Sequence, residues 1–400
     1  MNNETRKETQ VLPKDVRYVG ADDLTLPLFE NQYPVQPMGV SYNSYLILDE
    51  KIAVMDSVDA RAADEWLAKL AHELDGRRPD YLVISHMEPD HSGSILRLAE
   101  KYQEMKLVGN TKTFTMLRQF FGAKAPTDDR LLEVGEGETL PLGAHTLHFM
   151  LAPMVHWPEV MVAYEETEKI LFSADAFGRF GSLGRTANAP WAPQARRYYY
   201  NIVGKYGAQV QALLKKASAL EIETICPLHG PVLTGEALGE ALRLYDLWSR
   251  WQSESPDDIL LAHASIHGNT ARAAELLKQK LEAKGARVTL CDLTTTEVSY
   301  AVANAFYCGK LVLACSTYDG GLFPPMEEFL SHLQAKGFRD RSVGLMENGS
   351  WAPAAARLMR AKLEEMKDLR VCGTVVSLRS ALSPASEAQM ETLSAELCAK

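Results

Sequence analysis

Four side chains of the kinds that bind metal ions lie within six consecutive residues. The segment reads His86-Met87-Glu88-Pro89-Asp90-His91 and follows the short apolar run 81–85. Buried imidazoles and carboxylates this close repel one another or stay unpaired unless a cation neutralises them. The alternative is a solvated acidic loop in which two histidines occur by chance. We favour a metal site, because the density of ligands has no structural explanation.

Three further residues strengthen this interpretation. His156 lies in APMVHWPEV, Asp175 in LFSADAFG and His229 in CPLHGP. Each alone could cap a helix or pack in the core. Together with the cluster they supply four histidines and three carboxylates, enough for two metals that share a bridging carboxylate and keep open positions for a small ligand.

The ligand types favour iron over zinc. The two-zinc hydrolases of the metallo-β-lactamase fold carry an H-x-H-x-D-H cluster, and Glu88 replaces the second histidine here. An additional carboxylate makes the site harder and more anionic, which favours iron and stabilises its oxidised state. Zinc would make the protein a hydrolase and leave the second half of the chain without a role.

A second group of residues suits a phosphate. The segment 265–270, SIHGNT, joins an apolar run to a helical pattern, and its hydroxyls, glycine and consecutive amides form an anion cradle at a helix N-terminus. It is neither G-x-G-x-x-G nor a P-loop. It could simply cap the helix. Two later loops, each with one aromatic, favour flavin mononucleotide (FMN). The candidate FMN residues are Ser265, His267, Gly268, Asn269, Thr270, Ser316, Thr317, Tyr318, Asp319, Gly320, Asn348, Gly349 and Trp351.

The elements that position these residues divide into two patterns. The first part mixes sheet and helix: a hairpin within 41–59, a helix over 60–74, and strands over 81–85, 146–151, 160–164 and 169–173. After the polar, proline-bearing stretch 253–258, strands and helices alternate regularly, five of each, which predicts a doubly wound parallel sheet. We therefore expect domains over 1–252 and 259–400, joined by a linker at 253–258.

Length and composition limit the number of domains, the possible partners and the location of the protein. A chain of 400 residues exceeds what one core usually supports, and its net charge of −10 argues against nucleic acid as a partner. No run approaches the roughly 20 apolar residues of a membrane span. The polar segment 1–7 leads into no secretion signal, so we expect no membrane and a cytoplasmic protein. The six cysteines form no C-x-x-C pair and are expected to be reduced core thiols.

With these residues placed, the chain resembles the flavodiiron protein family over nearly its whole length. The resemblance rests on SYNSYLI, HMEPDH, PMVHWPE, LFSADAFG, LHG and SIHGNT. It implies an α/β fold with a metallo-β-lactamase-like αββα sandwich followed by a flavodoxin-like domain. It also implies that His86, Glu88 and His156 hold one iron, that Asp90, His91 and His229 hold the other, and that Asp175 bridges them.

The resemblance further implies an oxidoreductase that carries FMN and two iron ions per chain. Electrons would pass from an external donor through the flavin to the irons, which would reduce dioxygen to water or, alternatively, nitric oxide to nitrous oxide. The chain lacks the two C-x-x-C motifs of a fused rubredoxin, so a separate donor, usually a rubredoxin, is expected. Family members form head-to-tail dimers, so we expect a homodimer or a dimer of dimers.

The chain departs from the family pattern in one flavin loop, and two other functions are alternatives to the oxidoreductase. Relatives commonly have S-P-T-Y-N-N in the second flavin loop, whereas residues 315–320 read CSTYDG, and the added Asp319 would disfavour the anionic reduced flavin. A zinc hydrolase would leave the flavodoxin-like domain unexplained. A flavin-binding electron carrier with an inactive metal site would not be expected to keep all seven ligands.

Overall fold

The structure of the protein is a computed structural model that describes residues 12–399. Residues 1–7, from which we expected no secretion signal, lie outside the described part. The chain divides into two compact units, Met1–Asp246 and Leu247–Lys400. The first strand of the second unit, β17, begins at Ser255, so most of the segment 253–258 that we predicted as a linker is extended chain of that unit. Within residues 12–399, every helix is too short or too polar to cross a membrane.

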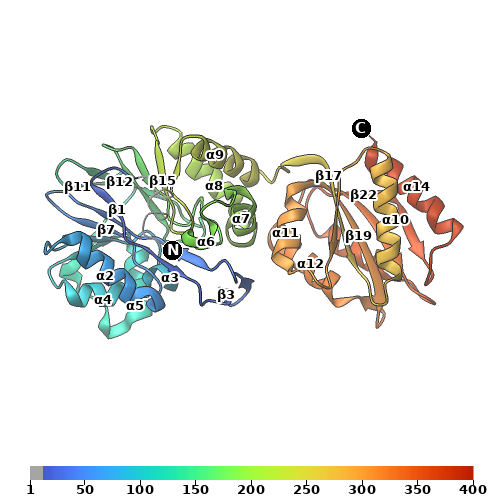
Figure 1. Cartoon of the computed structure of the whole chain (residues 1–400), viewed down its shortest axis with the longest axis horizontal. Helices are drawn as coiled ribbons and strands as arrows, with labels where there is room; N and C mark the ends of the chain where they lie inside the picture. Colours follow the sequence, from blue (N-terminus) through green and yellow to red (C-terminus); the bar gives the residue numbers. More distant parts are fainter. Residues whose placement is uncertain (1–11, 400) are drawn as a thin grey trace. The chain divides into compact units, whose positions relative to one another are not determined.

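The first unit contains two six-stranded sheets that lie face to face. Helices α2, α4 and α5 lie outside one sheet, and α8 and α9 lie outside the other (Figure 1). One sheet has the order β1 (Val16–Tyr18), β6 (Tyr45–Ile47), β7 (Ala53–Met55), β8 (Tyr81–Val83), β9 (Lys106–Gly109) and β10 (Leu131–Glu133). The other has the order β11 (Thr139–Pro141), β12 (Thr146–Leu151), β13 (Met161–Glu165), β14 (Ile170–Phe172), β15 (Thr224–Cys226) and β16 (Leu233–Thr234).

The helices and small strands of this unit connect and cover the sheets. The predicted hairpin is present, because β6 and β7 pair antiparallel. Two short pairs, β2 (Ala21–Asp23) with β5 (Val40–Tyr42) and β3 (Leu28–Phe29) with β4 (Tyr33–Pro34), lie outside the main sheets. The helices are α2 (Ala63–Leu74), α3 (Pro89–Ser92), α4 (Ile95–Lys101), α5 (Thr111–Phe121), α6 (Leu183–Thr186), α7 (Trp191–Tyr198), α8 (Gly207–Ala217) and α9 (Gly235–Ser249).

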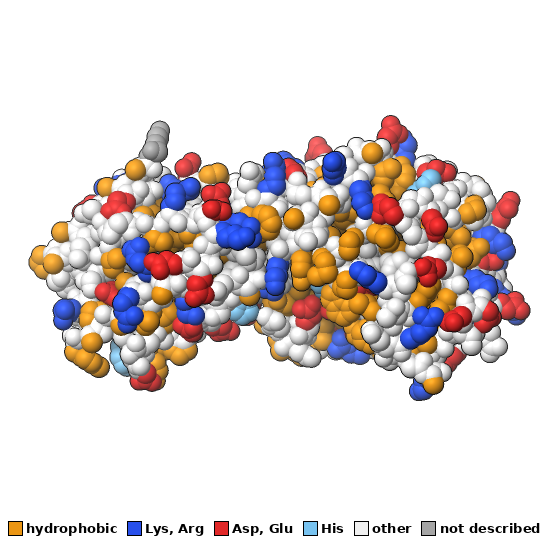
Figure 2. All heavy atoms as spheres, turned by 180° about the vertical axis from the view of Figure 1, so that it is seen from behind, with side chains coloured by type: hydrophobic (Ala, Val, Ile, Leu, Met, Phe, Trp, Pro, Cys, Tyr) orange, Lys and Arg blue, Asp and Glu red, His pale blue; other side chains and the backbone are white. Residues whose placement is uncertain are grey.

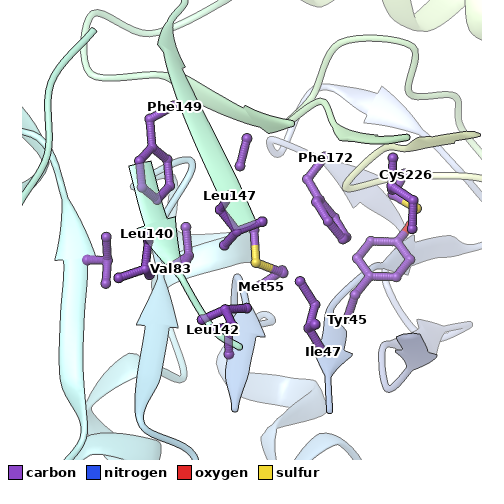
Figure 3. Packing of buried hydrophobic residues seen from close by; sticks show 14 of the residues in the cluster. Tyr45, Ile47, Met55, Val83, Leu140, Leu142, Leu147, Phe149, Phe172 and Cys226 are labelled. Carbon is purple, nitrogen blue, oxygen red and sulfur yellow. The ribbon is translucent and has the colours of Figure 1, made fainter. Parts of the chain in front are cut away.

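The main core of the first unit lies between its two sheets. Side chains from β6, β7 and β8 meet side chains from β12 and β14, with Met55, Leu147 and Phe172 at the centre (Figure 3). Strand β12 alternates buried and half-buried positions, as expected for a strand with one face in a core. Removing this apolar surface from water is the dominant stabilisation of such a layer, and it holds the strand ends that carry the candidate ligands.

The second unit is built around one parallel five-stranded sheet, with strand order β18-β17-β19-β21-β22. This is the order 2-1-3-4-5, typical of flavodoxin-like sheets, and it agrees with the predicted alternation. Helices α10 and α14 cover one face and α11 and α12 the other (Figure 1). The strands are β17 (Ser255–Ala264), β18 (Val288–Asp292), β19 (Cys308–Tyr318), β21 (Ser342–Asn348) and β22 (Arg370–Leu378), with β20 (Gly321–Leu322) paired to β19. The helices are α10 (Asn269–Ala283), α11 (Val298–Tyr307), α12 (Pro324–Ala335), α13 (Ala355–Glu364) and α14 (Pro384–Cys398).

Local sequence accounts for these elements. The buried segments 259–262 of β17 and 311–315 of β19 are continuous apolar runs because helices bury both faces of these central strands. Helices α12 and α14 each begin with a proline, which suits the first helical turn, and Ser383 closes a capping box on α14.

The cysteines and the surface charge complete the description. All six cysteines are free thiols, but Cys372 and Cys398 are only partly buried, so the expectation that every thiol lies in the core was wrong for these two. On the face shown in Figure 2, acidic and basic side chains are interspersed. The net charge of −10 is therefore not gathered into a single acidic area on that face.

Candidate metal centre and flavin site

The seven candidate metal ligands converge from four separate segments of the first unit. His86 and Glu88 follow β8, and Asp90 and His91 lie on the single-turn helix α3 rather than on an open turn. The other three ligands lie in the connection between β12 and β13, after β14 and after β15; they are His156, Asp175 and His229. Glu88 is half-buried, Asp90 lies at the boundary with 9% exposure, and the other five are buried.

The first group of ligands consists of His86, Glu88, His156 and Asp175. The Nε2 atoms of His86 and His156 each lie 3.2 Å from Oε2 of Glu88. Oδ2 of Asp175 lies 3.0 Å from Nε2 of His156 and 3.6 Å from Nε2 of His86. Four ligand atoms thus point at one small volume, which is the arrangement that a metal ion requires.

The second group consists of Asp90, His91 and His229. Oδ2 of Asp90 lies 3.2 Å from Nε2 of both histidines, and these two nitrogens are 3.1 Å apart. Oδ1 of Asp175 lies 3.2 Å from Nε2 of His91. The two oxygens of Asp175 therefore face different groups, which is the geometry of a carboxylate that bridges two metals.

The electrostatics of the cluster are those of a site that needs a cation. Burial disfavours a charged imidazole, but the carboxylates of Asp90 and Asp175 outweigh it and raise the pKa of His91 to about 10. Burial likewise disfavours an ionised Asp175, yet the facing histidines hold the pKa of its carboxyl well below the ordinary value. The site thus collects positive charge, which ligated metal ions would supply in place of protons.

Unsatisfied buried atoms show that metal ions fit. Within residues 12–399, neither oxygen of Asp90 nor Oδ1 of Asp175 accepts a hydrogen bond, although all three atoms are buried. The nitrogens of His91 and His229 that face each other can share only one proton. Such groups are costly in an interior unless something else pairs with them, and two divalent cations would pair with all of them.

Two ligand histidines donate a hydrogen bond from Nδ1, the ring nitrogen on the side away from the ligand cluster, and the acceptors differ. Nδ1 of His86 donates to Oε1 of Glu159 at 2.7 Å, and Nδ1 of His229 donates to the backbone oxygen of Ser41, also at 2.7 Å. Sequence reasoning did not assign a role to Glu159. The motif PMVHWPE places it three residues after His156, but only the fold shows that its partner is His86.

A cavity of about 460 Å³ opens beside the metal centre. Glu88 and Asp90 form part of its wall, and Leu26, Leu28 and Phe29 add apolar surface. Tyr198 packs its ring 5.6 Å from that of His229. Its buried hydroxyl has no hydrogen-bond partner among the described residues. The cavity is large enough for a small diatomic molecule.

In the second unit, the three predicted flavin loops meet at the carboxyl ends of neighbouring strands. The hydroxyl oxygens of Thr270 and Ser316 are 2.8 Å apart, and Nδ2 of Asn348 donates to Oγ1 of Thr270 at 3.2 Å. Ser265 accepts a hydrogen bond from the backbone N–H of Gly268 at 3.1 Å. These contacts join the loop and first helical turn after β17 to the carboxyl-terminal residues of β19 and β21.

The phosphate loop has the form that an anion requires. Gly268 has φ +86°, a left-handed conformation that favours glycine, and open space lies where a Cβ would be. Helix α10 begins at the next residue, so its first N–H groups have no acceptor within the helix. A phosphate monoester fits this cradle.

The remaining predicted flavin residues are less closely tied together. Tyr318 and Trp351 are 44% and 87% exposed, which leaves both aromatic faces available to a planar ligand. Thr317 instead accepts a hydrogen bond from the backbone of Ala354 at 2.9 Å. Within residues 12–399, no side-chain hydrogen bond joins the other predicted flavin residues to this cluster; they are His267, Asn269, Asp319, Gly320 and Gly349.

Known proteins resemble the chain over most of its length. Residues 40–230 match the family described as ODP family beta lactamase. The rubredoxin-oxygen oxidoreductase of Megalodesulfovibrio gigas is 27% identical over 387 residues, which cover 94% of each chain. The anaerobic nitric oxide reductase flavorubredoxin of Vibrio vulnificus is 26% identical over 94% of this chain and 76% of its own.

Solved structures agree with the sequence comparisons. Rubredoxin oxygen:oxidoreductase from Desulfovibrio gigas superposes with a TM-score of 0.89 at 25% identity, covering 97% of both chains. The flavodiiron protein from Giardia intestinalis superposes with a TM-score of 0.87 at 25% identity, again over 97% of both.

The fold and site define a class of proteins in which a metallo-β-lactamase-like sandwich with a cluster of histidines and carboxylates is joined to a flavodoxin-like unit. This confirms the predicted fold class. In sequence and fold the chain resembles the flavodiiron proteins over nearly its whole length, and it is an oxidoreductase.

Proposed function

We propose that this protein reduces dioxygen to water at a diiron site, with electrons that an external donor delivers through FMN. The observation that carries the proposal is the pair of ligand groups that share Asp175, one on each of its oxygens. The first unit would hold the irons and the second the flavin, which keeps the roles that we predicted for the two domains.

The ligand roles follow from the two groups. His86, Glu88 and His156 would hold one iron, and Asp90, His91 and His229 the other, with Asp175 between them. Ser265, Thr270, Ser316 and Asn348 would hold the phosphate end of FMN. When bound, two irons and one flavin supply one-electron chemistry and can together hold the four electrons that reduction of dioxygen to two waters requires.

Residues of the cavity wall and the hydroxyl of Tyr198 would determine how a substrate reaches the metal centre. Leu26, Leu28 and Phe29 form the apolar part of the cavity wall beside Glu88 and Asp90, and the charged side chains of Glu30, Asp59 and Arg61 complete the wall. The buried hydroxyl of Tyr198 can donate a hydrogen bond to a small polar group near His229. The wall and the hydroxyl would thus admit and orient the substrate.

Nitric oxide is the alternative substrate of the same site. One similar protein is named a rubredoxin-oxygen oxidoreductase and another an anaerobic nitric oxide reductase. Both substrates are neutral diatomic molecules of the size that the cavity admits. We give dioxygen precedence because the similar protein named for oxygen matches 94% of both chains.

A separate rubredoxin is the proposed donor, in line with the name of that similar protein. We also propose a head-to-tail homodimer, or a dimer of dimers, in which the flavin of one chain serves the irons of the other. This proposal rests on the resemblance to the family. Light scattering of the purified protein measures the oligomeric state directly, and a monomer that turns over at full rate would refute the arrangement.

The function is tested by cofactor content and turnover of the anaerobically purified protein. We expect about two irons and one FMN per chain, and consumption of dioxygen with reduced rubredoxin as the donor. Faster consumption of nitric oxide than of dioxygen would select the alternative substrate. Zinc in place of iron, with no reductase activity, would refute the proposed function and favour a hydrolase.

A further inference from the structure

Glu159 is a buried carboxylate that acts on the metal centre without being one of its ligands. Its side chain is fully buried, and Oε1 accepts from Nδ1 of His86 at 2.7 Å and from the backbone N–H of Met87 at 2.8 Å. Its own backbone oxygen accepts from Nδ2 of Asn110 at 2.6 Å. Glu159 is therefore fixed in place, with one oxygen directed at the ring of His86.

This contact determines which nitrogen of His86 can bind a metal. Oε1 of Glu159 already accepts a hydrogen bond from the backbone N–H of Met87, so it also faces His86 as an acceptor. Nδ1 of His86 therefore carries the proton. Nε2, which faces Glu88 and Asp175, is then left with a free lone pair. A carboxylate behind a ligand histidine also makes that ligand more basic.

The second group of ligands has no equivalent carboxylate among the described residues. Nδ1 of His229 donates to a peptide oxygen, that of Ser41. Nδ1 of His91 is buried and has no hydrogen-bond partner in residues 12–399. A neutral carbonyl raises the basicity of a histidine less than a charged carboxylate does. The two metal positions are thus chemically different, although the ligand types are similar.

We propose that Glu159 is a positioning residue that makes the two metal positions unequal, so that the position of His86, Glu88 and His156 holds its iron more tightly than that of Asp90, His91 and His229. The inference rests on the proposed two-metal site. It predicts that a chelator first removes the iron held by Asp90, His91 and His229. It also predicts that the negative charge of Glu159, as well as its shape, sets the difference in the rates of iron loss.

The test follows iron loss from the full-length, iron-loaded protein when a ferrous chelator is added without oxygen. Two phases of equal amplitude are expected in the wild type. Glu159→Gln keeps an acceptor for both N–H groups but removes the charge, so the slow phase should accelerate by about 10- to 100-fold while the fast phase is unchanged. Glu159→Leu, which removes the acceptor too, should accelerate the slow phase further.

A spectroscopic measurement separates this role from a purely structural one. Mössbauer spectra of the iron-57 protein should show two distinct irons, of which only one changes its parameters in Glu159→Gln. If Glu159 merely fixed the loop, the glutamine would keep both hydrogen bonds and both the spectrum and the phases would match the wild type. That result would overturn the inference and leave the proposed function intact.

The first unit offers a matched control. Half-buried Asp49 and buried His145 form another carboxylate–histidine pair, 2.8 Å apart, and neither belongs to the metal cluster. Asp49→Asn removes the same kind of charge and should leave both iron phases unchanged. A single phase in the wild type would refute unequal positions whatever the variants do. A wild-type protein that binds no iron would refute the proposed function together with the inference.

Discussion

The geometry of the metal centre depends most on two carboxylates that each contact more than one histidine. Asp175 reaches His156 with one oxygen and His91 with the other, and Glu88 stands between His86 and His156. Each is enclosed by histidines, so a change in its charge alters the metal preference more than it alters the fold.

Glu88→His tests the choice of metal. The variant restores the H-x-H-x-D-H cluster of two-zinc hydrolases and removes one negative charge, so iron should give way to zinc and oxygen consumption should fall to background. FMN content should stay at one per chain, because the flavin loops lie in the other unit. Elemental analysis and flavin absorbance measure both. Glu104→His, at an exposed position, is the control. Full iron occupancy with undiminished turnover would contradict the ligand assignment.

Asp49 gives a pH dependence that is separate from the metal centre. Burial opposes its ionisation, but hydrogen bonds from the backbone and ring of His145 lower its pKa to about 2. Because this folded-state pKa lies below the ordinary 3.8, the stabilisation is complete above that value and is lost as the pH falls towards 2.

We expect Asp49→Asn to lower the free energy of unfolding of the first unit by about 1 to 2 kcal/mol at neutral pH. The difference from the wild type should shrink as the pH falls from about 4 towards 2. Urea unfolding at several pH values measures it. Asp75→Asn, at an exposed position with φ +45°, should show no such trend. A difference that stays constant across this pH range would show that the charge of Asp49 contributes nothing.

The flavin site is a property of elements rather than of isolated residues. Loops after three parallel strands meet because the carboxyl ends of β17, β19 and β21 lie at one edge of the sheet. Thr270, in the first turn of α10, contacts Ser316 near the end of β19 and Asn348 at the end of β21. Its hydroxyl therefore links the phosphate loop to both others.

Thr270→Val should weaken FMN binding by about tenfold, because the variant has the same shape but loses the hydroxyl. Fluorescence titration of the flavin-free protein with FMN measures the change, and iron content should be unaffected. Thr289→Val, on the exposed face of β18, is the matched control and should bind FMN like the wild type. Loss of iron as well as flavin in Thr270→Val would indicate general misfolding instead.

The whole molecule consists of two units with separate cores. One core lies between the two sheets of the first unit, and the other between the five-stranded sheet and α10 and α14 of the second. All seven candidate metal ligands belong to the first unit and all candidate flavin residues to the second. Each cofactor should therefore bind without the other, although catalysis needs both.

Removal of FMN should leave about two irons per chain and abolish oxygen consumption with reduced rubredoxin. Adding FMN back should restore the activity, since the metal centre is built by the other unit. Iron content and the rate before and after reconstitution are the measurements, with mock-treated protein as the control. Undiminished turnover by flavin-free protein would show that electrons reach the metal centre by another route.

The amino-acid sequence by itself determined the elements and the kinds of chemistry. Alternating apolar runs and helical patterns predicted the five strands and five helices of the second unit, because burial on both faces leaves a periodic trace in the chain. The spacing of His86, Glu88, Asp90 and His91 indicated a metal site, because buried imidazoles and carboxylates this close repel one another or stay unpaired unless a cation neutralises them. The phosphate loop was equally visible, since a helix N-terminus with glycine and hydroxyls is a local feature.

Only the tertiary structure decided which atoms face one another. The two oxygens of Asp175 face different ligand groups, and Glu159 accepts a hydrogen bond from His86 and not from its sequence neighbour His156. Both facts depend on the packing of β8, in one sheet, against β13 and β14, in the other. The placement of Tyr198 beside His229 and the walls of the cavity depend on the same packing. Contacts between residues distant in the chain follow from how side chains fill a core, and neither periodicity nor spacing records that filling.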